Sequence, residues 1–237
     1  MSGYAGCADK LYVWFDTEYS DLELETASLL QVSALITDSS LRRVLPQAQD
    51  VRLAIRLSDG VVLSPWVEQN LSDLVKACRS TESVSVAEAD ARLAGYVDAA
   101  AGLPAERESG ASCSSSGASC SSNQRPVLAG NSVHTDWWLA RRFLPLFSSR
   151  LHYRHLDVTA LKLEWQRLHP DVESEASCLS FEKENPENIR RYFPEASLSA
   201  SSLRHDAYYD VQASIAELAF YRRFLLIDIN LRFREGI

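Results

Sequence analysis

Three short segments near the N-terminus have the side-chain pattern of β-strands, and they limit what the chain can fold into. Residues 11–15 form a compact run of β-favouring side chains, and apolar residues alternate with polar ones over 30–37 and 51–57. Turn-forming residues follow the second and third segments, at Asp38-Ser-Ser40 and Asp59-Gly60. This pattern predicts an antiparallel meander at the N-terminal end.

The remainder of the chain alternates between helical and strand-like stretches. We expect short strands at Val127–Ala129 and His155–Val158. We expect longer helices near Trp66–Cys78, Ala87–Ala101 and Asp136–Phe147, another that begins at about Thr159, and a last one over about Ala207–Leu226. Strands first, followed by alternating helices and strands, predict an α/β fold with a mixed sheet flanked by helices.

Two segments of unusual composition interrupt this pattern. A heptad rich in Gly and Ser is repeated in GASCSSSGASCSSN, which has no large apolar side chain, so we expect a low-complexity insertion over 105–125. A second, acidic and Ser-rich insertion is expected over 170–202, around a more structured FEKENPENIRRYF core. We therefore predict one domain over 11–226 containing both insertions, with tails at 1–10 and 227–237.

The overall composition excludes several classes of protein. A net charge of −8 argues against coating of long nucleic acids, which needs many Lys and Arg contacts to phosphates. The five cysteines are odd in number and form no CxxC pair, so we expect reduced thiols and no zinc site. No apolar run approaches the ~20 residues that span a bilayer, and no secretory signal is present. We expect a cytoplasmic protein without membrane attachment, with a mitochondrial location as the alternative.

The first acidic motif follows the first predicted strand. Asp16 and Glu18 are two residues apart, so both carboxylates point to the same face of the strand. Carboxylate oxygens suit Mg²⁺ or Mn²⁺, and two such ions about 3.5–4 Å apart can stabilise both the attacking and the leaving oxygen of a phosphoryl displacement. By itself the pair is also typical of a solvated strand edge or a turn cap.

Two further motifs add candidate ligands and a base. Asp136 follows an apolar strand and a Gly-Asn-Ser turn, where a third ligand could face the first strand, although an isolated Asp there is more often a helix N-cap. His205 lies five residues before Asp210 at the head of the last helix. A histidine can accept the proton of an attacking water near neutral pH, and Asp210 can ligate the metal. The alternative is a surface histidine near an acidic residue.

The order of these motifs resembles a known family. DTE, GNSVHTD, HYRHLDVTAL and HDAYYD followed by SIAELAFYR are similar to the DEDDh exonucleases, and specifically to the oligoribonuclease family, which degrades very short RNAs from the 3′ end. The resemblance covers roughly residues 11–75, 126–168 and 203–226. It implies a ribonuclease H-like fold and a homodimer. It also implies a two-metal centre in which His205 is the general base. The implied metal ligands are Asp16, Glu18, Asp136 and Asp210.

The resemblance also implies residues that hold the RNA. Leu22 matches a leucine that wedges between the two bases of a dinucleotide, and Trp66 and Tyr153 match aromatic residues that family members supply from the partner subunit. Three polar residues match the groups that cap the substrate's 5′ phosphate: Ser132, Arg154 and Thr159, the last in place of a serine. Such a cap selects short RNA because a longer chain would have to continue through it. The alternative is that these side chains only pack or form surface ion pairs.

Three positions depart from the family's pattern. Leu71 stands where the family carries a histidine of the phosphate cap, which predicts weaker binding of the 5′ phosphate or binding by another group. Asp21 adds a negative charge beside the expected substrate path, and Gln31 replaces the usual glutamate. Neither position is an expected metal ligand, so we expect an active enzyme.

The leading hypothesis is therefore a metal-dependent 3′→5′ exoribonuclease that converts di- to pentanucleotides into mononucleotides. The nearest alternative keeps this chemistry but trims longer single-stranded RNA or DNA. A third hypothesis, suggested by the two insertions, is a non-catalytic subunit of an RNA-processing assembly that uses the old active-site fold for docking.

Overall fold

The structure is a computed structural model that describes residues 10–102, 125–169, 180–198 and 205–234. The predicted Gly- and Ser-rich insertion lies almost wholly outside these residues, together with Cys113 and Cys120. Of the cysteines, Cys78 is described, and its thiol is buried and donates to the Leu30 carbonyl at 3.1 Å. Among the described helices, none is long and apolar enough to cross a membrane.

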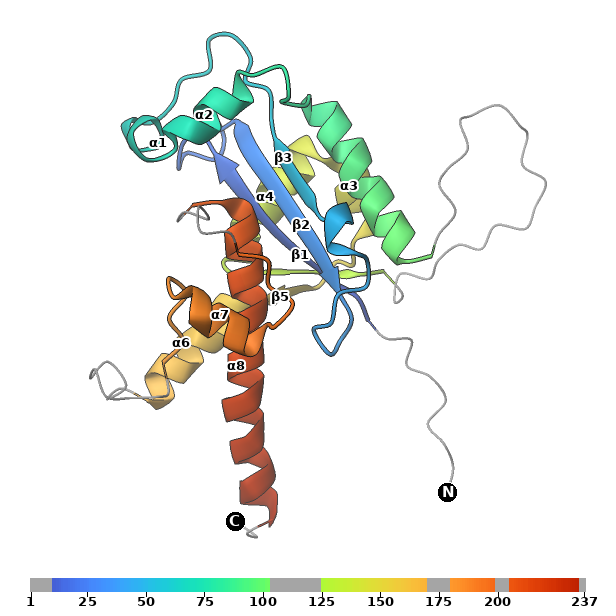
Figure 1. The fold of residues 1–237 in the computed structure, drawn as a ribbon, viewed down its shortest axis with the longest axis vertical. Helices are drawn as coiled ribbons and strands as arrows, with labels where there is room; N and C mark the ends of the chain where they lie inside the picture. Colours follow the sequence, from blue (N-terminus) through green and yellow to red (C-terminus); the bar gives the residue numbers. More distant parts are fainter. Residues whose placement is uncertain (1–9, 103–124, 170–179, 199–204, 235–237) are drawn as a thin grey trace, which may run out of the picture.

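Five strands form a single mixed sheet in the order β3-β2-β1-β4-β5 (Figure 1). The central strand β1 pairs antiparallel with β2 and parallel with β4, β2 pairs antiparallel with β3, and β4 pairs parallel with β5. The strands are β1 (Tyr12–Tyr19), β2 (Leu29–Thr37), β3 (Val51–Ala54), β4 (Val127–Gly130) and β5 (His155–Asp157). The predicted antiparallel meander and mixed sheet are confirmed, and β1 extends four residues beyond the predicted run.

Three of the five predicted helices differ in their bounds from those observed, and eight α-helices are described. They are α1 (Pro65–Asn70), α2 (Ser72–Cys78), α3 (Val86–Ala100), α4 (Val133–Phe143), α5 (Pro145–Arg150), α6 (Val158–Leu168), α7 (Pro186–Tyr192) and α8 (Ala207–Arg234). The helix expected over 66–78 is broken at Leu71. The helix expected over 136–147 is broken before Pro145, because proline has no backbone N–H to continue the ladder. Helix α8 continues to Arg234 through most of the predicted C-terminal tail.

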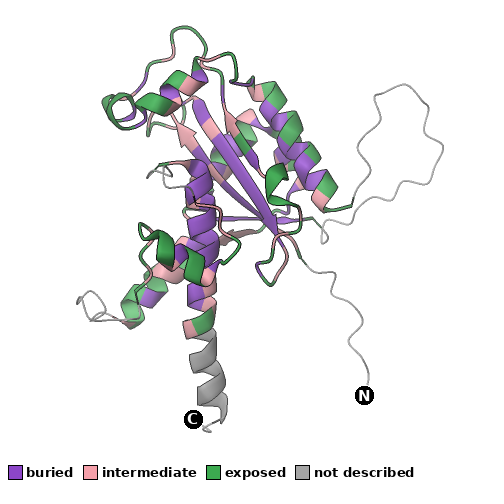
Figure 2. Cartoon of the chain, in the orientation of Figure 1, coloured by how far each residue is buried: buried purple, intermediate pink, exposed green. Residues whose placement is uncertain are grey.

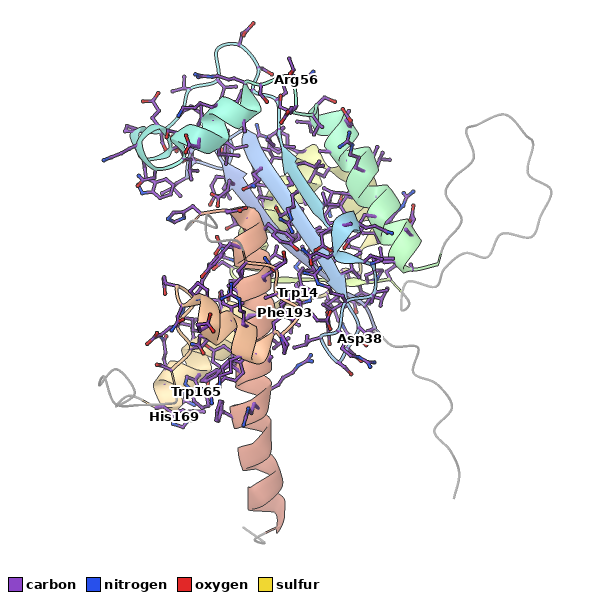
Figure 3. All side chains as sticks on the ribbon, in the orientation of Figure 1. Trp14, Asp38, Arg56, Trp165, His169 and Phe193 are labelled. Atoms are coloured by element: carbon purple, nitrogen blue, oxygen red, sulfur yellow. The ribbon has the colours of Figure 1, made fainter. Side chains whose placement is uncertain are left out.

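The helices cover both faces of the sheet, and the alternation of β1 side chains assigns each residue to one face. Val13 and Phe15 face α3, α4 and α5, and the Phe15 ring lies 4.9 Å from that of Phe147. Trp14 faces α6, α7 and α8, in the same core as Phe193 (Figure 3). Figure 2 shows that most of β1, β2 and β4 and the half of α8 beside the sheet are buried. The carboxylates that follow Trp14 on alternate positions therefore point toward α8.

The described part of the second predicted insertion packs into this core. Ile189 on α7 and Phe193 just after it are buried against α8, and the Phe181 ring lies 5.9 Å from that of Phe220. The hydroxyl of Tyr209 on α8 donates to the backbone carbonyl of Lys183 at 2.8 Å. These contacts hold residues 180–198 along α8, close to the end that carries the predicted site.

Candidate active site

Three of the four predicted ligands meet where β1 passes the start of α8. One carboxylate oxygen from each of Asp16, Glu18 and Asp210 lies within 4.8 Å of the other two. Asp16 and Glu18 share one face of β1, as the two-residue spacing predicts, and Asp210 lies in the first turn of α8. Such a set of hard oxygen donors has the chemistry that Mg²⁺ or Mn²⁺ requires.

The fourth predicted ligand, Asp136, lies on the other side of β1. Its side chain is 5% exposed and accepts a hydrogen bond of 2.7 Å from the hydroxyl of Thr17, the middle residue of the DTE motif. Helix α4 begins at Val133 after Ser132 in a left-handed conformation, so Asp136 lies inside the first turn and is not the N-cap. The N-cap alternative for Asp136 is wrong, and Thr17 is a partner of the site that the motif analysis missed.

The carboxylates raise one another's pKa values. Burial, followed by the charges of Asp136, Asp210 and Glu18, raises the pKa of Asp16 well above its ordinary value. Burial, followed by the charge of Asp210, raises the pKa of Glu18 to about 8. Burial also raises the pKa of Asp136 to about 7, although the Thr17 hydroxyl opposes this. Carboxyl groups that resist ionisation beside one another ionise more readily when a multivalent cation balances their charge, so the site favours such an ion.

The start of α8 is fixed by Asp206, directly before the helix, and by Gln31 on β2. The Asp206 carboxylate accepts the Tyr208 N–H at 3.0 Å, which caps the helix. The Gln31 amide donates to Asp206 at 3.1 Å and accepts the Ala207 N–H at 3.0 Å. Gln31 lies directly opposite Glu18 in the β1–β2 register. The departure at Gln31 therefore supplies both a donor and an acceptor that anchor α8 beside the carboxylates.

His205 precedes this helix in a strained conformation and contacts Trp66. Its φ angle is 64°, in the left-handed region, and its exposed ring forms a T-shaped contact with the Trp66 ring at a centroid distance of 4.8 Å. Helix α1 is brought to this place because the Ser64 N–H donates to the Ser20 carbonyl beyond β1 at 3.0 Å. Trp66 therefore lines the cleft of its own chain, whereas the resemblance implied an aromatic residue from a partner subunit.

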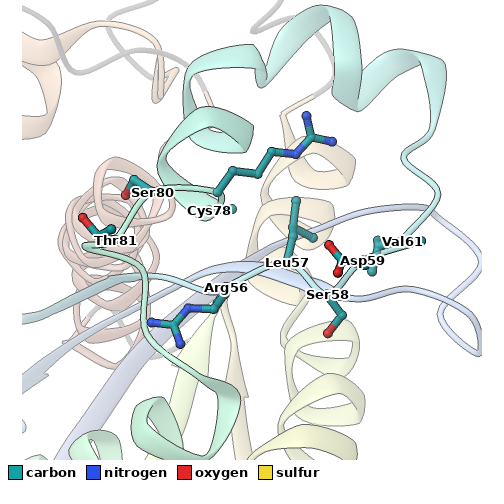
Figure 4. A pocket seen from close by; sticks show the side chains of 10 residues that line it. Arg56, Leu57, Ser58, Asp59, Val61, Cys78, Ser80 and Thr81 are labelled. Atoms are coloured by element: carbon teal, nitrogen blue, oxygen red, sulfur yellow. The ribbon is translucent and has the colours of Figure 1, made fainter.

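These residues line a cleft of about 630 Å³. Leu22, whose side chain is 87% exposed, lies at this cleft together with Asp21, which adds the expected negative charge. The lining includes the predicted ligands, base and RNA-binding residues Asp16, Glu18, Asp210, His205, Leu22 and Trp66. A second cleft of about 610 Å³ lies beside α2 (Figure 4), but its lining offers Asp59 as its one carboxylate and so lacks a comparable donor set.

The other predicted RNA-binding residues form two pairs outside the lining of the carboxylate cleft. The Ser132 N–H donates to the Thr159 hydroxyl at 2.8 Å, and the two hydroxyls are 3.3 Å apart. The Arg154 guanidinium donates to the Tyr153 hydroxyl at 3.0 Å, and the Tyr153 side chain is 70% exposed. The Ser132–Thr159 pair follows the C-terminal ends of the parallel strands β4 and β5, whereas Tyr153 and Arg154 lie directly before β5, at the opposite end of these strands.

Leu71 has a structural explanation. It is 5% exposed and packs with Leu30, Val67 and Val75 under the break between α1 and α2. A side chain in this position cannot reach a phosphate in solvent. The histidine of the family's phosphate cap is therefore replaced here by a core residue.

Comparisons with known proteins identify relatives along most of the chain. Oligoribonuclease from Nocardia farcinica is 31% identical over 221 residues, which are 91% of this chain and 81% of that protein. The chain belongs to the oligoribonuclease family. Oligoribonuclease from Mycobacterium tuberculosis is 29% identical over 89% of this chain and 79% of that protein. Oligoribonuclease from Alkalilimnicola ehrlichii is 27% identical over 93% of this chain and 92% of that protein. No family model matches the chain.

Solved structures confirm the exonuclease fold. Exonuclease I from E. coli in complex with an oligonucleotide matches with a TM-score of 0.55 and 15% identity, and exonuclease I from Methylocaldum szegediense matches with a TM-score of 0.57 and 16% identity. The match covers 95% of this chain but only 43% of each of those chains. Membership in the oligoribonuclease family, together with this fold, makes the protein a 3′→5′ exoribonuclease, a hydrolase of phosphodiester bonds.

The raised carboxyl pKa values predict how stability depends on pH in the absence of metal. Glu18, with a pKa of about 8, and Asp136, with a pKa of about 7, bind more protons in the folded protein than in the unfolded chain above about pH 4.5. The Tm measured in EDTA should therefore fall as pH rises from about 5 to about 8. With Mn²⁺ present the fall should be smaller, because the ion stabilises the deprotonated carboxylates. A Tm in EDTA that rises over this interval would contradict the prediction.

Proposed function

We propose that the protein hydrolyses very short RNA, from di- to pentanucleotides, to 5′-mononucleotides by a two-metal-ion mechanism with Mg²⁺ or Mn²⁺. The observation that carries the proposal is the convergence of Asp16, Glu18 and Asp210 in one cleft with His205 and Leu22. The names of the relatives, oligoribonucleases, support the RNA substrate and its short length.

In this proposal the chain's own residues have separate tasks. Asp16, Glu18 and Asp210 hold the ions, and Asp136 contributes from the other side of β1. When bound, the ions would lower the pKa of the attacking water and stabilise the oxygen that leaves. His205, at the exposed rim of the cleft, accepts the proton of that water. Leu22 and Trp66 present apolar surface to the bases at the 3′ end of the RNA.

The selection of short RNA is proposed to come from a cap on the 5′ phosphate. Ser132, Thr159 and Arg154 offer two hydroxyls and a guanidinium, which suit a terminal phosphate. These groups and Tyr153 lie outside the lining of the chain's own carboxylate cleft, so we extend the proposal to a homodimer in which Tyr153 reaches the cleft of the partner. The exposed Tyr153 ring supports this arrangement.

A comparison of substrate lengths tests the proposal. With Mn²⁺, 5′-labelled RNA of two residues should be hydrolysed at least about tenfold faster than RNA of twenty residues, because only the short RNA places its 5′ phosphate in the cap. Arg154→Ala should slow the dinucleotide reaction by about ten- to a hundredfold, the cost of a lost charged hydrogen bond, and leave the slow reaction on long RNA unchanged.

The matched control is Arg167→Ala, which removes an exposed arginine of α6 that pairs with Glu164 of the same helix at 3.0 Å. This variant should keep the wild-type preference for the dinucleotide. Equal rates on both lengths would favour trimming of longer single-stranded nucleic acids. Absence of hydrolysis with either metal would instead favour a non-catalytic role.

A further inference from the structure

The segment over 180–198 brings a lysine to the carboxylate cluster. The Lys183 ammonium forms an ion pair with Asp210, one of the three clustered carboxylates. Lys183 is not part of any motif that carries the family resemblance, and it lies just before α7, in a segment that composition marks as an insertion. The chain therefore places a cation of its own at the proposed metal site.

The position of Lys183 is fixed by packing on α8. The backbone carbonyl of Lys183 accepts a hydrogen bond of 2.8 Å from the hydroxyl of Tyr209, the residue directly before Asp210. Helix α7, which follows Lys183, packs against α8 through Ile189 and the adjacent Phe193. The Lys183 side chain is itself only 35% exposed. A side chain held at both its backbone and its charged end samples few alternatives to this ion pair.

The charge of Lys183 acts on more than one carboxylate. Besides Asp210, the carboxylates of Asp16 and Glu217 lie close enough for their charges to act on the Lys183 ammonium. The ammonium in turn opposes the rise of the Asp16 and Glu18 pKa values. Lys183 therefore neutralises part of the charge that a divalent ion would neutralise.

We propose that Lys183 is a tethered counter-ion of the catalytic carboxylates, one that pairs with Asp210 in the metal-free enzyme and is displaced from Asp210 when a divalent ion binds. The inference rests on the proposed metal-dependent function. If the Lys183 ammonium and a divalent cation were both bound to Asp210, they would lie only a few ångströms apart and would repel each other strongly. The two cations therefore compete for Asp210. The lysine stabilises the metal-free protein and sets the metal concentration at which the site fills.

Calorimetric titration with Mn²⁺ and thermal unfolding in EDTA test this role without measuring activity. Lys183→Met should bind Mn²⁺ at least about tenfold more tightly than the wild type, because no charge has to be displaced. In EDTA its Tm should fall by about 3 °C or more, because the carboxylates lose their counter-ion. Lys183→Arg, which keeps the charge, should resemble the wild type in both measurements.

The matched control is Lys76→Met, which removes an exposed lysine of α2 paired with Asp73 at 2.7 Å and should change neither quantity. In an Asp210→Asn background, Lys183→Met should lower the Tm in EDTA by less than it does in the wild type, because the ion pair between the two residues is already lost. Unchanged or weaker Mn²⁺ binding by Lys183→Met would contradict the proposal that Lys183 and the metal ion compete for Asp210. If the wild type itself binds no Mn²⁺, the proposed function fails, and the measurements in EDTA still decide whether Lys183 is a counter-ion.

Discussion

Replacement of Asp210 by Asn is expected to lower kcat/KM on a dinucleotide by at least a few hundredfold, about the loss that follows removal of one transition-state charge contact. Asp210 supplies a carboxylate oxygen to the cluster with Asp16 and Glu18. An amide has nearly the same shape but no negative charge, so the site would hold divalent ions far more weakly. Single-turnover hydrolysis of labelled dinucleotide over a range of Mn²⁺ concentrations measures the effect.

The matched control is a substitution at Asp206, four residues before Asp210 and directly before α8. Asp206→Asn makes the same chemical change at the residue that caps α8, and Asn is as good an N-cap as Asp. This variant should therefore keep α8 in place and keep most of the activity. Wild-type hydrolysis by Asp210→Asn would show that the phosphodiester chemistry takes place elsewhere in the molecule.

Local sequence patterns were sufficient to predict the part of the site that lies on one element. Asp16 and Glu18 share a face because side chains alternate along any strand, whatever the rest of the fold does. The arrival of Asp210 beside them depends on how α8 packs over Trp14, and neither spacing nor composition determines that packing. The order of motifs shared with the oligoribonuclease family supplied this long-range information.

Residues that act through long-range contacts were not predictable in this way. Gln31 anchors the start of α8 through two hydrogen bonds across more than 170 positions of the chain, and no local motif signals such contacts. Lys183 lies in the FEKENPENIRRYF core of the second predicted insertion, to which the sequence assigned no function. Leu71 is buried beneath the break between two short helices, whereas the sequence predicted one continuous helix. In each case tertiary packing determines the role of the residue.

The proposed base can be tested without disturbing the backbone. His205 has a φ angle of 64°, and Asn tolerates the left-handed region better than most residues, so His205→Asn should fold with a Tm close to that of the wild type. Without the imidazole, kcat should fall by about 100- to 10,000-fold, the usual contribution of a general base, while Mn²⁺ binding by the carboxylates persists.

The comparison that isolates the proton-transfer role uses a second histidine. His134→Asn changes an exposed histidine of α4 that is outside the lining of the carboxylate cleft, and it should leave kcat unchanged. Trp66→Phe keeps an aromatic ring against His205, so its kcat should fall far less than that of His205→Asn. Near-wild-type turnover by His205→Asn would assign the base to another group. Loss of both kcat and Mn²⁺ affinity would instead mean that His205 supports the carboxylate cluster itself.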